Sequence, residues 1–143
     1  LRQSFNYIAI VIIVCMSDRK IIDLEFPVRS SEHILFSCLS TPSGLSEWFC
    51  DDVNSRGETF SFFWDGSEEV AKLVKSVKNT FIQFKWESDE GPSSFSFEFR
   101  IETDELTGDT LLRVTDHVEP DEVEEMKLLW TSQVASLLRH IGG

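Results

Sequence analysis

The sequence predicts an α+β domain in which a curved antiparallel sheet of about six to seven strands wraps around one long C-terminal helix. Three observations predict this class. Apolar and polar residues alternate from residue 53 to 118 between short turn signals. The last segment carries apolar residues at helical spacing over about five turns. Two helix-start signals, which predict two short helices, follow the first alternating segment.

Length and charge limit the function classes. The chain has 143 residues, of which 41% are apolar, which is enough for one domain with a sizeable core. Its formal net charge of -12 repels phosphate backbones and anionic membrane surfaces, so we expect no nucleic-acid partner. Such charge most often serves solubility, and a basic partner protein is the weaker alternative.

The first fifteen residues differ from the rest. Residues 5–15 are apolar except for Asn6, but eleven residues are too few for a membrane span, which needs about 20. No small-residue cleavage site of a signal peptide follows them. We therefore expect no membrane span, interpret residues 1–15 as an upstream extension or mis-assigned start outside the fold, and expect a single domain over 16–143.

The first strand and helix are predicted from spacing and capping. Apolar residues alternate with polar ones over 22–28, which indicates a strand with one wet face, and Pro27 suits the end of that strand. Ser30 or Ser31 can then cap a helix that runs through Leu39.

A second short helix is predicted over 41–49. Thr41 suits its N-cap and Pro42 its first turn, where a missing N–H costs nothing. The segment ends in Trp48 and Phe49. Because two adjacent aromatic residues cannot both face one buried stripe, we expect one in the core and the other capping or lining a cavity. Two ordinary core residues are the alternative.

The segment from 53 to 118 reads as an antiparallel meander. Turn signals stand at residues 65–66, 78–79, 90–92 and 107–109. They bound predicted strands at residues 59–64, 69–77, 80–86, 94–103 and 110–118. The alternation places many aromatic residues on one face of the sheet, from positions such as 60–64, 82–86 and 95–101.

The last element is predicted to be the longest helix. Asp121 and Glu124 have the spacing of a capping box, and Gly142 suits a helix stop. The apolar stripe that would cover the sheet consists of Val123, Met126, Trp130, Val134, Leu137, Leu138 and Ile141.

The order of elements is similar to START-like (SRPBCC, helix-grip) domains. Three segments strengthen the likeness: Thr41-Pro42-Ser43-Gly44-Leu45-Ser46-Glu47-Trp48-Phe49, Phe84-Lys85-Trp86 and Leu112-Arg113-Val114-Thr115-Asp116. Together they resemble the branch related to the heat-shock-chaperone ATPase activator homologues. The likeness spans about residues 19–138, and its motifs are structural rather than catalytic.

The resemblance implies a cavity between the curved sheet and the long helix, which relatives use for lipids, polyketides, hormones or aromatic compounds. The residues that could line it here are Trp48, Phe49, Phe62, Trp64, Phe84, Trp86, Phe97, Phe99, Met126 and Trp130. A core filled by these bulky side chains is the alternative.

Enzyme chemistry has little support in the sequence. His33, His117 and His140 lie in no ligand-spaced motif. His117 with Asp116 is the best acid/base pair, yet neighbouring strand residues point to opposite faces. We predict no catalytic residue.

The cysteines indicate neither a metal nor a cofactor. Cys38 and Cys50 are too far apart for a zinc knuckle or a CxxC pair, and Cys15 lies in the N-terminal extension. Buried free thiols suit a reducing cytoplasm, which is the expected location.

Three function classes follow from these patterns. The leading one is non-enzymatic binding of a small hydrophobic ligand. The second is a protein-interaction module, either chaperone-cofactor-like or homodimeric, in which Phe63 and Phe81 are exposed on the face opposite the core. The third is a cyclase or aromatase type of enzyme, which requires a polar group inside the cavity.

Overall fold

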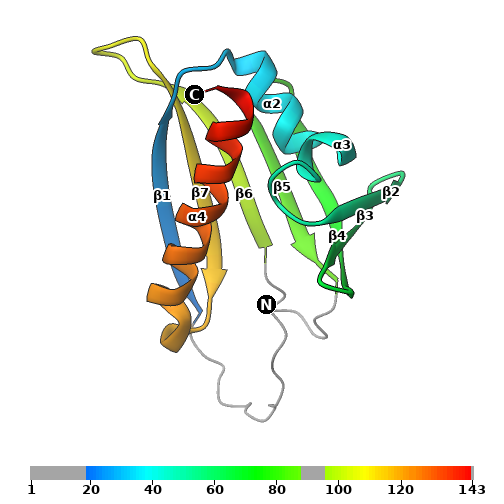
Figure 1. Ribbon diagram of the computed structural model, residues 1–143. Helices are drawn as coiled ribbons and strands as arrows, with labels where there is room; N and C mark the ends of the chain where they lie inside the picture. Colours follow the sequence, from blue (N-terminus) through cyan, green and yellow to red (C-terminus); the bar gives the residue numbers. More distant parts are fainter. Residues whose placement is uncertain (1–18, 88–95, 143) are drawn as a thin grey trace.

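The computed structural model describes residues 19–87 and 96–142. It confirms the predicted fold class, because seven antiparallel strands form one sheet in the order β1-β7-β6-β5-β4-β3-β2 and a long helix lies over one face (Figure 1). The elements are β1 (Lys20–Val28), α2 (Glu32–Ser40), α3 (Pro42–Leu45), β2 (Asp52–Arg56), β3 (Thr59–Trp64), β4 (Ser67–Val77), β5 (Phe81–Trp86), β6 (Ser96–Thr103), β7 (Thr110–Val118), η1 (Pro120–Glu122) and α4 (Val123–Ile141). The apolar segment 5–15 and the predicted turn at 90–92 lie outside the described residues.

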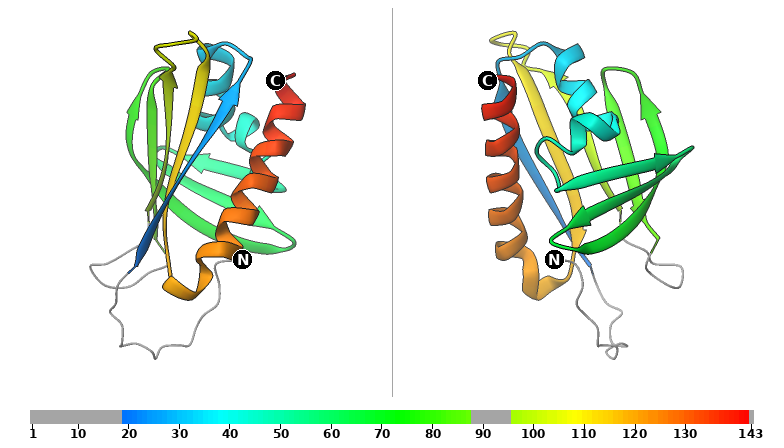
Figure 2. Two further views of the ribbon diagram at one scale, coloured as in Figure 1. Left: turned by 90° about the vertical axis from the view of Figure 1, so that its left-hand side faces the viewer. Right: turned by 45° about the vertical axis from the view of Figure 1, so that its right-hand side comes forward.

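The helices share one side of the sheet. Figure 2 shows α4 running along that side, with α2 and α3 at the end where α4 finishes. Strands β2 to β4 bend round toward the helices, and α3 contacts β2. The sheet therefore has an inner face under the helices and an outer face without them.

The predicted helix starts are confirmed by their caps. The Ser31 hydroxyl accepts a hydrogen bond from the Ile34 N–H at 3.2 Å, and the Thr41 hydroxyl accepts one from the Gly44 N–H at 3.0 Å. Each cap satisfies a backbone donor of the first helical turn. Helix α3 is shorter than expected, since it ends at Leu45 and continues as turns.

The described turns support the predicted hairpins. Asp65 and Gly66 have φ of 51° and 88°, as a two-residue turn between twisted strands requires. Asn79 has φ of 61° in the next connection, and Asn tolerates this left-handed region better than most residues.

One prediction for the last helix, the capping box at its start, is wrong. Asp121 forms no capping box, because Pro120–Glu122 is a 3₁₀ turn in which the Glu122 N–H bonds the Glu119 carbonyl at 2.9 Å. This turn moves the α-helix start to Val123, beyond Asp121. The predicted stop is confirmed, since Gly142 has φ of 80° and its N–H donates to the Leu138 carbonyl.

The core lies between the inner sheet face and the helices. The α4 stripe faces it as predicted: Trp130, Val134 and Leu137 are buried, while Val123 and Met126 pack against the core from its margin. Asp116, at 0% exposure, is the charged residue buried among these apolar groups in the described part of the chain.

Candidate functional site

The ten aromatic or pliable residues predicted to line a cavity all belong to or pack against the interior core. Strands supply Phe62 and Trp64 (β3), Phe84 and Trp86 (β5), and Phe97 and Phe99 (β6), while Met126 and Trp130 come from α4 and Trp48 and Phe49 from the turn after α3. Eight are buried, and Trp64 and Met126 are partly buried at the margin. The fold thus gathers residues that are far apart in the sequence.

Phe49 lies at the centre of this interior. Its ring centroid is 5.2 Å from that of Phe62, 5.5 Å from Phe97 and 5.7 Å from Trp130, with Trp130 stacked on it. Its carbonyl oxygen accepts hydrogen bonds at 2.9 Å from Trp64 Nε1 and from Gln133 Nε2. Phe49 therefore links β3, β6 and α4.

Trp48 is buried as well. The exposed fractions of Trp48 and Phe49 are 6% and 3%, so both side chains lie in the core, and that one of them also lines a cavity stays a prediction. Because α3 ends at Leu45, Trp48 and Phe49 lie in a turn rather than on a regular helix, and both side chains can point into the core. The Trp48 indole N–H bonds the Cys38 carbonyl at 2.9 Å, which ties this turn to α2.

Asp116 places a carboxylate inside the aromatic interior. One of its oxygens accepts a hydrogen bond from Trp130 Nε1 at 2.8 Å, and the other accepts one from the His117 backbone N–H at 2.8 Å. The side chain of His117 lies on the other face, with Nδ1 3.0 Å from the Ser96 carbonyl oxygen. Asp116 and His117 therefore point to opposite faces, as the strand period predicts.

Asp116 is not among the predicted site residues and is considered from the sequence only as a partner of His117, although its position carries a further signal. Asp116 shares the parity of Leu112 and Val114 along β7, and this places it on the apolar face. A charged residue in an otherwise apolar series is uncommon in a core unless it is hydrogen-bonded.

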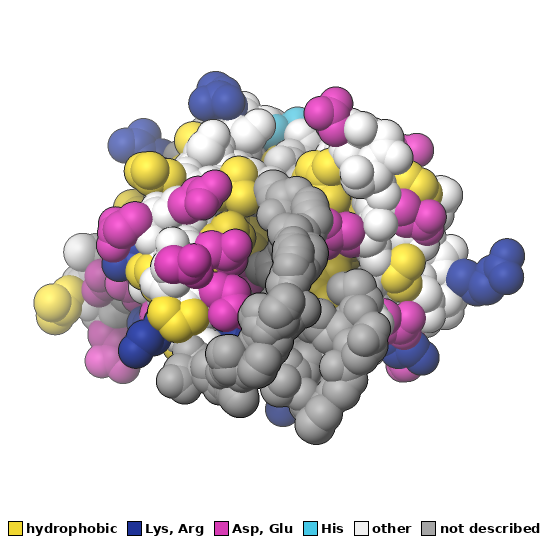
Figure 3. All heavy atoms as spheres, turned by 90° about the horizontal axis from the view of Figure 1, so that it is seen from below, with side chains coloured by type: hydrophobic (Ala, Val, Ile, Leu, Met, Phe, Trp, Pro, Cys, Tyr) yellow, Lys and Arg dark blue, Asp and Glu magenta, His cyan; other side chains and the backbone are white. Residues whose placement is uncertain are grey.

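A surface pocket of about 480 Å³ adjoins the interior at the β3–β4 turn. It is lined by Asp51, Trp64, Asp65, Ser67 and Glu69. The Trp64 ring connects this pocket to the core. The centroid of the Trp64 ring lies 5.4 Å from that of Phe49 and 6.2 Å from that of Trp86. Acidic and apolar side chains lie side by side at this end of the molecule (Figure 3).

The carboxylates of this pocket determine which ligand charge the pocket would accept. Asp51, Asp65 and Glu69 supply three negative groups around Trp64. Asp51 also fixes the turn, since its side chain accepts a hydrogen bond from the Asp65 N–H at 2.8 Å. An anionic head group would be repelled there, whereas a neutral or cationic one would not.

The two described cysteines are free thiols. Burial raises the pKa of the Cys50 thiol from 9.0 to about 12, and burial also raises the pKa of Cys38. Because the thiolate is the nucleophile, neither thiol has the lowered pKa of a reactive cysteine.

We therefore expect Cys50 to react slowly with iodoacetamide in the native protein at pH 8. A pKa of about 12 leaves about 1000-fold less thiolate than a pKa of 9, and the rate should rise about tenfold per pH unit up to pH 11. The folded state keeps this proton between pH 9 and 12, so the contribution of Cys50 to stability falls as pH rises through that range. Mass spectrometry of the Cys50 peptide measures the rate, with urea-unfolded protein as the control. Equal rates in both states at pH 8 would contradict the shift.

Residues 19–87 and 96–142 contain no group of three or more His, Cys, Asp or Glu residues that could hold a metal ion. Over the same part of the chain, no helix has the length and apolar character needed to cross a membrane.

The fold and interior define the class of protein as a helix-grip α+β domain. The chain belongs to the START-like superfamily, because the model of the START-like superfamily domain matches residues 16–143. No curated protein matched the sequence.

Solved structures agree with this assignment. The protein BfR322 from Bacteroides fragilis is 38% identical, with 87% of this chain and 92% of that chain covered and a TM-score of 0.62. The Aha1 dimer from Colwellia psychrerythraea is 21% identical, covering 85% and 96%, with a TM-score of 0.72. DynU16, a protein from the dynemicin biosynthetic locus, is 17% identical over 85% of this chain and 47% of its own, with a TM-score of 0.72. The last two show likeness of fold.

Proposed function

We propose that the protein binds a small hydrophobic ligand without chemical conversion, at the Trp64 pocket and the aromatic interior behind it. The observation that carries the proposal is that the pocket and the aromatic interior meet at Trp64. This residue lines the pocket and also contacts the buried rings of Phe49 and Trp86. A pocket of about 480 Å³ lies within the range of about 300–1,000 Å³ typical of small-molecule sites.

The packing of the interior restricts how the ligand would sit. The ring centroids of Phe84 and Phe97 are 5.3 Å apart and those of Trp86 and Phe97 are 5.1 Å apart, which is direct contact between rings. The ligand would therefore occupy the pocket over Trp64 and reach inward only as rings such as Trp86 move aside. The carboxylates of the pocket favour a neutral or amine-bearing ligand over a fatty acid.

Binding can be tested with Nile red, a neutral apolar dye. Ser67 lies opposite Trp64 in the β3–β4 register and is exposed, so Ser67→Phe would cover the Trp64 ring without disturbing the core. We expect this variant to weaken dye binding at least tenfold at an unchanged melting temperature. Dodecylamine should also displace the dye at lower concentration than dodecanoate.

The matched control is Glu68→Phe. It adds the same side chain one residue further, at an exposed position on the outer face of the sheet, and should leave dye binding within about twofold. Equal loss in both variants, or no dye binding by the unsubstituted protein, would refute the pocket. Fluorescence titration and a thermal melt of each variant supply the two readouts.

A protein-interaction module is the second candidate function. The close contacts of Phe97 with Phe84 and Trp86 favour this candidate. An interior filled by side chains has no room for a ligand, so that any binding would occur at the surface of the molecule. The structural neighbour Aha1 was solved as a dimer, which makes self-association a specific form of this candidate. Phe81 does not supply the exposed apolar surface expected for it: Phe81 is 7% exposed, and Lys75 and Arg100 lie over its ring.

A further inference from the structure

Strand β4 is longer than its neighbour β3, and its last residues form an uncovered edge of the sheet. The pairing of β3 with β4 ends at Thr59 opposite Lys72. Beyond that pair, the Leu73 N–H bonds the Glu58 carbonyl at 2.8 Å, in the connection before β3. Strand β4 then continues over residues 74–77, where its register in the described part of the chain is with β5 alone. We call residues 74–77 the open edge.

The backbone at the open edge has hydrogen-bonding groups that point away from β5. The Val77 carbonyl accepts a hydrogen bond from the Thr80 N–H at 3.0 Å, across the β4–β5 turn, so Val77 directs its backbone groups toward β5. Neighbouring residues of a strand direct theirs to opposite sides. Ser76 therefore directs its N–H and C=O to the open side. Leu73 directs its C=O there too, because its N–H points to Glu58. An extended peptide can bond such groups as a further strand.

The side chains of the open edge are exposed as well. Val74 and Val77 are 50% and 45% exposed, and Lys75 and Ser76 are also exposed. The register on β5 shifts between Leu73 and Lys75, which marks a bulge of the kind common at sheet edges. Apolar side chains beside free backbone groups are the surface that an added strand would cover.

This part of the chain is basic, although the protein is acidic. The formal net charge of the chain is -12, yet residues 70–86 contain no carboxylate and four lysines: Lys72, Lys75, Lys78 and Lys85. The first three lie on β4 or in the turn directly after it. Glu58, in the connection that Leu73 contacts, adds one negative charge near them. The open edge therefore carries a local excess of positive charge.

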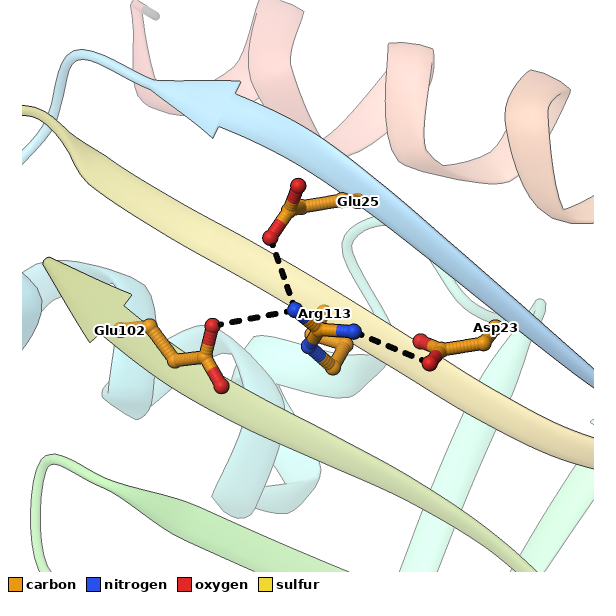
Figure 4. Close-up of polar contacts among 4 residues, drawn as sticks. All are labelled: Asp23, Glu25, Glu102 and Arg113. Carbon is orange, nitrogen blue, oxygen red and sulfur yellow. Dashed lines mark hydrogen bonds and ion pairs between the residues drawn. The ribbon is translucent and has the colours of Figure 1, made fainter. Parts of the chain in front are cut away.

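A cation elsewhere on the sheet shows what an internal partner looks like. Arg113 on β7 forms ion pairs with three carboxylates (Figure 4): Asp23 at 2.9 Å, Glu25 at 3.0 Å and Glu102 at 3.4 Å. Within residues 19–87 and 96–142, by contrast, no ion pair is found for Lys75 or Lys78. These two ammonium groups are available to carboxylates of another molecule.

We propose that the open edge binds an extended acidic segment of another protein, which adds to the sheet as a strand beside β4. The backbone of the segment pairs with Leu73 and Ser76, and its carboxylates face Lys75 and Lys78. A second copy of this chain is not the occupant, because two open edges side by side would bring lysines against lysines. The open edge lies at the opposite end of β4 from Ser67 and the Trp64 pocket, so the inference does not depend on ligand binding.

The length of the open edge limits the affinity. Few backbone hydrogen bonds can form along residues 74–77, and each contributes only about 1 kcal/mol net. The segment also loses conformational entropy when it becomes ordered. A Kd on the order of 0.1 mM is therefore expected for a short peptide.

The charge contacts can be tested with a fluorescein-labelled peptide of seven alternating valine and glutamate residues. Alternation places every glutamate on one face of the added strand, where the lysines lie. Lys75→Glu should weaken peptide binding at least tenfold, because it replaces an attraction with a repulsion. Arg139→Glu makes the same change in charge on α4 and should leave binding within about twofold. Fluorescence anisotropy at constant salt measures both.

The backbone pairing is tested separately with two N-methylated peptides. One carries the methyl groups on its valines and the other on its glutamates, so each blocks the N–H groups along one edge of the peptide. The set that faces β4 should lose binding at least tenfold, and the other should remain within about threefold. Ser76→Pro removes the N–H at the open edge and should also weaken binding at least tenfold, at a melting temperature close to that of the unsubstituted protein.

Three outcomes would overturn the proposal. Absence of peptide binding at 1 mM would leave the lysines as protection of the edge against pairing. Equal loss in Lys75→Glu and Arg139→Glu would assign the effect to net charge. Equal binding of the two methylated peptides would mean that charge alone holds the peptide, as it would a nucleic acid. Nile red binding should be unchanged in Lys75→Glu, so the result is separate from that of the pocket.

Discussion

Replacing Phe49 with alanine should lower the free energy of unfolding by about 3–5 kcal/mol, as for other buried Phe→Ala changes. Phe49 is 3% exposed and touches rings from β3, β6 and α4. Those rings are held by separate elements and cannot all close into the space that alanine leaves, so a cavity remains. The melting temperature should fall by about 10 °C or more.

Phe63→Ala is the matched control for this change. Phe63 lies on the outer face of β3, is only partly buried and is absent from the core, and its loss should cost less than about 1.5 kcal/mol. Urea unfolding with a shared m-value gives both numbers. Equal effects of the two substitutions would show that Phe49 is not the centre of the interior.

The second large effect concerns the hydrogen bond between Asp116 and Trp130. Trp130→Phe keeps a ring but removes the donor that lies 2.8 Å from the buried carboxylate, and Asp116→Leu leaves the indole N–H without that acceptor. Each change should destabilise the protein by about 2–4 kcal/mol, because a buried polar group loses a partner.

The double variant provides the decisive comparison. Replacing both residues removes the polar pair together, so its cost should be about 1–3 kcal/mol smaller than the sum of the single costs. Asp116→Asn serves as the conservative control, since its side-chain oxygen can still accept from Trp130, and it should cost less than Asp116→Leu. Additive costs across the double-mutant cycle would mean that the hydrogen bond contributes little to holding α4 on the sheet.

Local patterns were sufficient to predict the elements that depend on neighbouring residues. Alternation predicted β3, β5 and β7, and capping chemistry predicted the starts of α2 and α3, because both signals act over a few residues. The capping box at Asp121 failed for the same local reason, since Pro120 begins a competing 3₁₀ turn.

The inner lining was predictable as a group of residues but not as a packed arrangement. The parity of each strand placed Phe62, Phe84, Phe97 and Phe99 on one face, and all four are buried there. Their mutual contacts depend on the register between strands that are distant in the sequence, and no local pattern carries that information. Nile red titration of the Ser67→Phe variant tests whether a ligand enters among these rings.

The sequence by itself determined the fold class, the order of the elements and which residues face inward, because periodicity and turn chemistry are properties of short segments. Only the tertiary structure decided that Trp48 and Phe49 are buried together, that Asp116 bonds Trp130 inside the core, and that Arg100 covers Phe81 on the outer face. The physical reason is shared by all three. Each depends on side chains from separate elements whose distances are fixed when the sheet, the turn after α3 and α4 pack together.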